Sequence, residues 1–218
     1  MNKLNFTFVF VLLFSFNFLT AQDHTKNHDD DNQQSDSRFS IIGFGGVGYT
    51  SVDNDNQPNY NLDASTFDIL VHYRIGKRYG ISTGIGFNQL TGNGFNSANQ
   101  NFYHERGTIK IPLLFSANYN VSRKVRLVAN IGFYGQTVVK DEYSFATTTI
   151  KDVYEGWSFG FQSGIGMSYN LNHKLSLGIM FNTQGDFTSI DSNSNAGFTD
   201  KQKIAGINTI GLLFGINL

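Results

Sequence analysis

The 218-residue sequence contains no cysteine, only two prolines and a single tryptophan. The missing thiols exclude a disulfide framework, a thiolate metal site and a lipid anchor on an N-terminal cysteine. Charged residues are also sparse, at 15%, and nearly balance to a formal net charge of -1. Nucleic-acid-binding proteins carry a strongly basic surface, so we expect no nucleic-acid partner.

Long apolar runs are missing after the first 21 residues. Lys3 precedes an apolar stretch over 6–19, and Ala21 is a small residue suited to cleavage. This pattern predicts a signal peptide over 1–21 and therefore export; an uncleaved anchor helix is the alternative. The apolar stretch is short for a membrane span of about 20 residues, which favours cleavage.

Residues 22–38 contain no aliphatic or aromatic side chain. Such a segment buries nothing to offset the cost of ordering its backbone, so we predict a disordered acidic tether in the periplasm. His24, His28 and the acidic run 29–31 leave open the loose binding of a divalent cation. The folded domain is predicted to span 39–218.

Aromatic residues and glycine are abundant instead, with 21 Phe, 10 Tyr and 23 Gly. Mean hydropathy is only -0.23, yet apolar residues recur at every second position from residue 39 onward. This period predicts β-strands with one apolar face. Eight such runs occur, at 39–49, 67–75, 79–88, 109–119, 125–136, 157–169, 175–184 and 210–218.

The connections between these runs alternate in length along the chain. Three are tight, near 76–78, 121–124 and 172–174, and four are long, at roughly 50–65, 91–106, 137–155 and 186–203. Bacterial outer-membrane barrels show this alternation, with short periplasmic turns and longer outer loops. The sequence therefore predicts an all-β fold, an eight-stranded antiparallel transmembrane β-barrel in the outer membrane of a Gram-negative bacterium. Its expected surroundings are outer-membrane lipid and lipopolysaccharide.

Outward-facing aromatic residues gather at two heights and predict two membrane-interface belts. The predicted belts are Tyr73, Tyr79, Tyr119 and Tyr169 beside the tight turns, and Phe87, Phe133, Trp157 and Phe181 toward the long loops. From Trp157 to Tyr169 the strand covers about 40 Å, which a tilt of about 40° projects to about 30 Å. This height matches an apolar band with its aromatic girdles.

The opposite strand faces carry charged residues that would point into the barrel. These are Asp68, His72, Arg74, Lys110 and Arg126. Eight strands enclose little more than their own side chains, so we predict a buried network of ion pairs and hydrogen bonds. The alternative is a gated ion path plugged by Asp68 through a bridge to Lys110 or Arg126.

Polar residues of the predicted long loops raise the question of catalysis. The candidates are His104, Glu105, Asp141, Glu142, Ser144 and Asp152. A nucleophile, a histidine and an acid act together only within hydrogen-bond reach, and the sequence has no nucleophile-elbow motif. We therefore expect no enzyme, no cofactor and no metal. Val138, Val139 and 147–150 predict that the third hairpin extends beyond the membrane, where strand edges can hold a partner.

The segment Ile111, Pro112, Leu113 and Leu114 resembles the I-P-L-L segment of the PorT-type outer-membrane barrels of Bacteroidetes. The eight-strand layout is similar to the small OmpA and OmpX barrels. Pro112 lacks a backbone N–H and would mark a bulge or local bend. At Leu218 the sequence departs from the aromatic residue that usually ends such barrels.

Three functional hypotheses follow. The leading one is a non-enzymatic barrel with a structural, adhesive or partner-binding role through its extracellular loops, with other envelope proteins as candidate partners. The resemblance implies a second, an accessory role in PorT-type protein secretion. The third is a loop-based enzyme that modifies lipid or hydrolyses a substrate.

Overall fold

The computed structural model describes residues 38–193 and 199–218, which belong to one compact unit over 34–218. The predicted signal peptide and the candidate cation ligands His24 and His28 lie outside these residues, as does the predicted tether up to residue 37. In the described part of the chain, no helix is long and apolar enough to cross a membrane.

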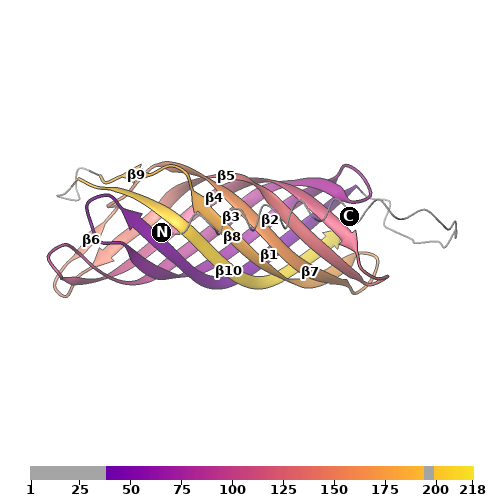
Figure 1. Cartoon of the computed structure of the whole chain (residues 1–218), viewed down its shortest axis with the longest axis horizontal. Coiled ribbons are helices and arrows are strands. Elements are labelled where there is room, and N and C mark those ends of the chain that lie inside the picture. The colour runs from indigo at the N-terminus through magenta and orange to yellow at the C-terminus, as the bar shows by residue number, and fades with distance from the viewer. Residues whose placement is uncertain (1–37, 194–198) are drawn as a thin grey trace, which may run out of the picture. The chain divides into compact units, whose positions relative to one another are not determined.

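Eight long antiparallel strands form a closed ring (Figure 1). They are β1 (Phe39–Asn54), β2 (Tyr60–Arg74), β3 (Tyr79–Phe95), β4 (Asn101–Asn120), β5 (Val125–Ser144), β7 (Trp157–Asn170), β8 (Leu175–Asp186) and β10 (Lys201–Asn217). Pairing of β1 with β10 closes the ring. Two short strands, β6 (Thr149–Lys151) and β9 (Ile190–Asp191), pair with β5 and β10. The predicted eight-stranded antiparallel barrel is confirmed.

The strands are staggered around the ring. Successive Cα partners run Ser40, His72, Ser82, Leu114, Gly132, Gln162, Gln184, Ile207 and Thr50. One circuit therefore returns to β1 at residue 50 after starting at residue 40, and this stagger tilts the strands across the barrel axis (Figure 1). Eight tilted strands enclose an interior just wide enough to be filled by side chains.

The two ends of the barrel differ. The turn end carries the tight turns and Leu218. The loop end carries the connections 55–59, 96–100 and 145–156, and the described parts 187–193 and 199–200 of the fourth. The predictions of long loops over 50–65 and 91–106 are wrong, because β1 to β4 continue to short hairpin tips. The inward residues of these extensions include Val52, Leu62 and Leu90, which are buried in one apolar cluster. Continued strand pairing satisfies the backbone around that cluster.

Pro112 lies inside β4 without shifting the strand register. Pairing with β5 runs through it, and pairing with β3 has the same register on both sides. Thr83 Oγ1 donates to the Pro112 carbonyl at 2.8 Å. Of the bulge or local bend predicted at Pro112, the bulge is wrong. The β4–β5 bulge lies between Gly107 and Thr108, where Val139 is the extra residue of β5.

This bulge decides which side chains of β5 enter the barrel. Before Val139 the buried residues are even-numbered, as with Tyr134 and Gln136, and after it they are odd-numbered, as with Asp141 and Tyr143. A one-residue insertion exchanges the two faces of a strand, because successive side chains alternate. The bulge therefore turns the end of β5 so that Asp141 points inward.

The outer face of the barrel is apolar along much of its length. All eight residues of the predicted belts face outward, with exposed fractions from 37% for Tyr73 to 61% for Phe133. Between them lie exposed aliphatic residues such as Ile69, Ile85 and Ile131. This outward apolar surface is what lipid would cover in a transmembrane barrel.

Candidate functional site

The middle of the lumen is closed by an ion pair. Lys110 Nζ lies 3.1 Å from Asp68 Oδ1, and both side chains are at most 1% exposed. The same ammonium donates to the side-chain carbonyls of Gln162, at 3.0 Å, and Gln184, at 2.7 Å. A Cβ on Gly86 would collide with both members of the pair, so only glycine leaves room for them here.

The other predicted lumen residues lie nearer the turn end. His72 Nδ1 is 2.9 Å from Ser82 Oγ, and Arg126 donates to Asn170 Oδ1 at 2.7 Å. Arg74 is half-buried where β2 ends. Of the five residues predicted to share a network, the structure thus joins Asp68 to Lys110 directly and gives His72 and Arg126 partners of their own. A void of about 30 Å³ beside Asp68 and His72 has room for about one water.

A second polar layer fills the lumen toward the loop end. Asn88 and Gln136 bond to each other, and Gln136, Tyr134 and Ser158 all donate to the carboxylate of Asp186. Beyond this layer an apolar cluster fills the side formed by β1, β2, β3 and β10. These layers close the lumen below the loop end, and the bridge between Asp68 and Lys110 is a contact that the buried network and the gated ion path both predict.

Above these layers, β4 and β5 bring together a buried histidine, arginine and aspartate. Arg106 and Asp141 are register partners, and Arg106 Nε donates to Asp141 Oδ1 at 2.7 Å. His104 Nε2 lies 2.8 Å from the same oxygen, and its Nδ1 lies 2.9 Å from the hydroxyl of Tyr60 on β2. The backbone N–H of Tyr154 donates to the other carboxylate oxygen at 3.1 Å.

The height of this cluster is marked by charged residues on the outside of the same strands. Lys140 Nζ lies 2.9 Å from Glu105 Oε1 and 3.6 Å from Glu142 Oε2, and Lys151 also pairs with Glu142. Charged side chains facing lipid are costly, so this height lies beyond the apolar band. His104, Arg106 and Asp141 are therefore in the part of the barrel that projects from the membrane.

The protonation states decide which groups of this cluster donate hydrogen bonds and which accept them. Burial lowers the pKa of His104 to about 4, although its bond to Asp141 acts the other way. Burial opposes ionisation of Asp141, but Arg106 and His104 outweigh it and leave that pKa below its usual value. Asp141 is thus a carboxylate, and neutral His104 donates from Nε2 and accepts at Nδ1. Tyr60 must donate its hydroxyl proton to His104, and its oxygen is left to accept.

Tyr60 forms part of the floor of a hollow at the loop end. The hollow has a volume of about 770 Å³, within the range of small-molecule sites. Its lining comes from five segments: Asn54, Gln57 and Tyr60; Phe95, Asn96, Ser97, Ala98, Gln100, Asn101 and Phe102; Tyr143, Phe145, Ala146, Thr147 and Thr148; Ile150, Val153 and Tyr154; and Gln202. These described residues include six aromatics, nine amides or hydroxyls without a ring, and no charged side chain.

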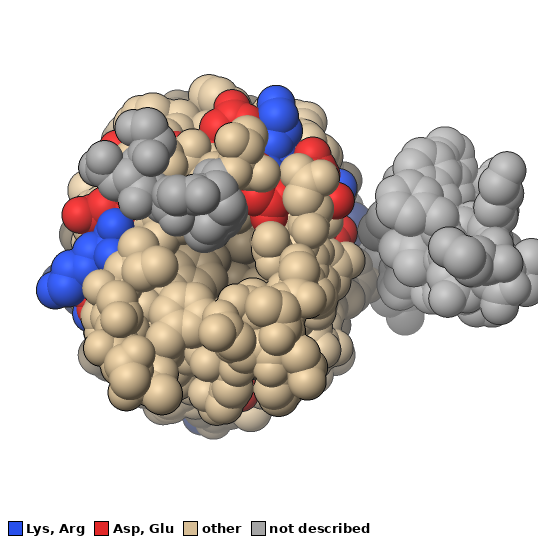
Figure 2. All heavy atoms as spheres, turned by 90° about the vertical axis from the view of Figure 1, so that its left-hand side faces the viewer, with Lys and Arg blue, Asp and Glu red and all other residues tan. Residues whose placement is uncertain are grey.

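The loop end seen head-on has an uneven distribution of charge. Figure 2 shows the acidic and basic side chains gathered along one side of the rim, with uncharged residues around the hollow and on the opposite side. The ion pair of Lys201 with Asp191 and the ladder around Lys140 account for part of this charge. The hollow itself is therefore an uncharged site beside a charged rim.

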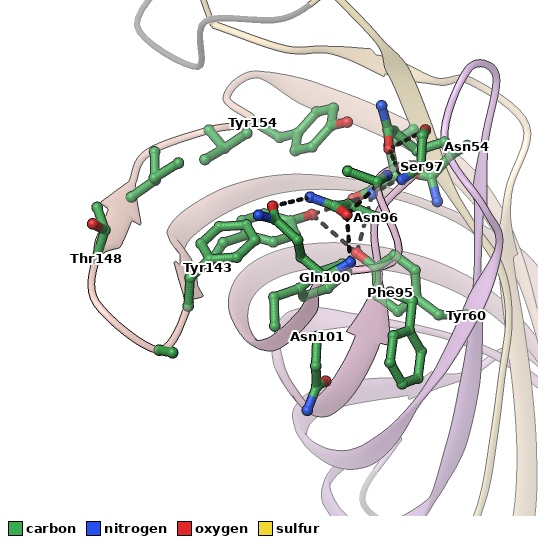
Figure 3. Close-up of a pocket in the computed structure, with 18 of the residues that line it drawn as sticks. Asn54, Tyr60, Phe95, Asn96, Ser97, Gln100, Asn101, Tyr143, Thr148 and Tyr154 are labelled. Atoms are coloured by element: carbon green, nitrogen blue, oxygen red, sulfur yellow. Dashed lines mark hydrogen bonds between the residues drawn. The ribbon is translucent and has the colours of Figure 1, made fainter.

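Hydrogen bonds hold the rim of the hollow in place. Asn96 accepts from the backbone N–H groups of Ala98 and Gln100 and donates to the Gln100 side chain (Figure 3). Gln57 Oε1 accepts from both the backbone N–H and the hydroxyl of Ser97, which ties the first loop to the second. The walls are therefore ordered by the chain's own contacts.

The structure places the candidate catalytic residues in three different settings. His104 and Asp141 meet, but both are buried and committed to Tyr60, Arg106 and the backbone. Glu105 and Glu142 face outward in ion pairs, and the Ser144 hydroxyl bonds to Thr149. Asp152 is an exposed loop residue with φ of 54°. No nucleophile among the described residues joins the histidine and acid.

The sequence did not identify Tyr60, Arg106 or Gln202, because each fell inside a predicted loop. A usable signal was present over 102–106, where Phe102, His104 and Arg106 alternate with outward Tyr103 and Glu105. This is the same period of two that revealed the strands. Two of its three inward residues, His104 and Arg106, are polar, so the segment does not stand out as a continuation of β4.

Comparisons with known proteins agree with this architecture. The family model described as "Outer membrane protein beta-barrel domain" matches residues 8–212. No curated protein matches the chain significantly. Among solved structures, Neisserial surface protein A has a TM-score of 0.51 at 9% identity, over 84% of this chain and 98% of that one. OprG from Pseudomonas aeruginosa has a TM-score of 0.50 at 11% identity, over 85% and 99%.

At these identities the solved structures support the fold alone, whereas the family match spans nearly the whole sequence. Together with the closed ring and its apolar outer face, the family match also establishes that the protein lies in the outer membrane. The chain belongs to the outer-membrane β-barrel domain family and is an outer-membrane protein.

Proposed function

We propose that this barrel is a non-enzymatic binding protein whose loop end faces the outside of the cell and holds a ligand in the hollow. The observation that carries the proposal is a preformed hollow of about 770 Å³ above a lumen closed by Asp68 and Lys110. A closed lumen does not favour transport through the barrel, while a pocket with ordered walls favours binding. The short turns then lie in the periplasm, as in other outer-membrane barrels.

Two further points belong to this proposal. The outward apolar face, with the two aromatic belts, contacts outer-membrane lipid and lipopolysaccharide. Membership of the PorT-type group rests on the segment Ile111, Pro112, Leu113 and Leu114. A role in protein secretion rests on the same segment. A deletion strain tests that role, because failure to export secreted proteins would favour it over ligand binding.

The test of the binding role is native mass spectrometry of the protein isolated from outer membranes. Ala146→Trp places a large side chain in the wall of the hollow, and Thr149→Trp, on the same hairpin but outside the lining, is the matched control. We expect a non-lipid ligand on the wild type and on Thr149→Trp, and its loss from Ala146→Trp. Equal loading of all three proteins, or discrete conductance in planar bilayers, would overturn the proposal.

A further inference from the structure

The strongest unexplained feature of the hollow is Gln202 at its floor. This side chain is 1% exposed, and its Oε1 has no hydrogen-bond donor among the residues that the structure describes. Its Nε2 has three acceptors: Asn54 Oδ1 at 2.5 Å, Tyr60 O at 3.2 Å and Tyr143 O at 3.3 Å. A buried acceptor without a donor costs about 1–3 kcal/mol, so the position calls for an explanation.

The orientation of the Gln202 amide follows from its neighbours. Asn54 Nδ2 donates to the Pro58 carbonyl at 2.9 Å, and a carbonyl can only accept, so Asn54 turns its own oxygen toward Gln202. Tyr60 has committed its proton to His104 and likewise presents an oxygen. Gln202 must therefore direct its NH₂ at these acceptors, and Oε1 is the group left for a ligand.

The walls around this acceptor restrict the ligand further. A charged ligand would be desolvated without an opposite charge, because the lining residues that the structure describes carry none. An entirely apolar ligand would leave Gln202 Oε1 unpaired. The ligand must therefore be uncharged, carry O–H or N–H donors, and also have apolar faces for the aromatic residues.

Three aromatic residues of the lining have ring surface that a ligand can reach: Phe95 is 54% exposed, and Tyr60 and Phe145 are half-buried. Figure 3 shows Tyr60, Tyr143 and Tyr154 reaching the hollow from different segments. The negative face of an aromatic ring attracts the weakly positive C–H groups that one face of a sugar ring presents.

We infer that the hollow binds a short neutral oligosaccharide, with one sugar hydroxyl donating to Gln202 Oε1. Sugar hydroxyls both donate and accept, as the amides of the rim do, and a sugar ring has an apolar face for the aromatics. The volume of about 770 Å³ is sufficient for a short chain of sugar units. This inference rests on the proposed binding function and names its ligand class.

The test is a glycan array of neutral and acidic oligosaccharides, probed with the detergent-solubilised full chain, with affinities then measured for the best neutral glycan. We expect binding to neutral glycans and at least about tenfold weaker binding by Gln202→Met, which removes the acceptor. Phe95→Ala should also weaken binding. Phe95 is an exposed lining residue, so this variant keeps the test valid if Gln202→Met fails to fold.

Phe187→Ala is the matched control, because Phe187 is an exposed aromatic at the loop end outside the lining. We expect its affinity to equal that of the wild type. Absence of binding to every neutral glycan would overturn the inference, as would equal affinity of Gln202→Met and Phe95→Ala with the wild type. If native mass spectrometry then shows a charged or apolar ligand lost only from Ala146→Trp, the binding function stands and the saccharide does not. If it shows no ligand, both fail.

Discussion

The middle of the lumen and the hollow at the loop end are built by the same strands but use charge in opposite ways. In the middle, Asp68 and Lys110 point at each other and occupy the space. At the loop end, Arg106 and Asp141 lie beneath the floor, and the lining above them is uncharged. A paired charge in the centre closes a barrel, whereas a paired charge below the floor orients neutral groups and leaves the space open.

The difference between the regions depends on Val139, so its deletion should have the largest effect. Without the bulge, Lys140 and Glu142 would turn inward, and Asp141 would turn away from Arg106. We expect the free energy of unfolding to fall by about 5 kcal/mol, because a buried guanidinium loses its partner. Urea unfolding in detergent micelles measures this loss.

Cysteine labelling checks the cause of that loss. The chain has no cysteine, so Glu142→Cys offers a single thiol to a maleimide. We expect rapid labelling of Glu142→Cys in the protein that retains Val139, and slow labelling of the same thiol when Val139 is deleted. Equal labelling rates would show that the strand end does not reverse its faces.

The middle region is tested by Lys110→Met, which leaves Asp68 buried without a counter-charge. We expect a loss of about 4 kcal/mol in the free energy of unfolding, again measured with urea. Adding Asp68→Asn should recover much of it, since neither charge then remains. If the double variant is no more stable than Lys110→Met, the cost comes from lost packing and not from an unpaired charge.

The loop end should respond to acid through His104. Its pKa is about 6.5 when unfolded and about 4 when folded. Between these values the unfolded chain binds a proton that the folded chain does not, so stability is full above pH 6.5 and falls as the pH drops toward 4. The total loss is about 3 kcal/mol, at 1.36 kcal/mol per pKa unit.

Urea unfolding from pH 7 to pH 4 measures this dependence. His104→Gln keeps a hydrogen-bond donor and an acceptor but does not titrate. Between pH 7 and pH 4 the stability of this variant should therefore fall by about 3 kcal/mol less than that of the wild type. Parallel curves for the two proteins would show that folding does not lower the pKa of His104.

The contrast between the regions also explains what the sequence could predict. The strands in the apolar band have an apolar outward face at period two. This pattern predicts seven of them clearly, while the glycine-rich run 39–49 predicts a strand of ambiguous facing. The strand extensions beyond the band lack this apolar outward face. In β4, for example, the charged Glu105 points outward and His104 and Arg106 point inward. The sequence pattern therefore predicts loops there. The hollow depends on tip contacts such as Gln57 with Ser97, which no local pattern encodes.

The smallest expected effect is at Pro112, where the sequence predicts a bulge or local bend and the structure keeps the strand register. Thr83 Oγ1 donates to the Pro112 carbonyl in a part of the β3–β4 ladder interrupted by the proline. Thr83→Val keeps the shape and removes that donor, so we expect a loss of about 1 kcal/mol in urea unfolding. In a Pro112→Ala background a backbone N–H returns to the ladder, and the same change should then cost less. An equal cost in both backgrounds would mean that the hydroxyl does not compensate for the proline.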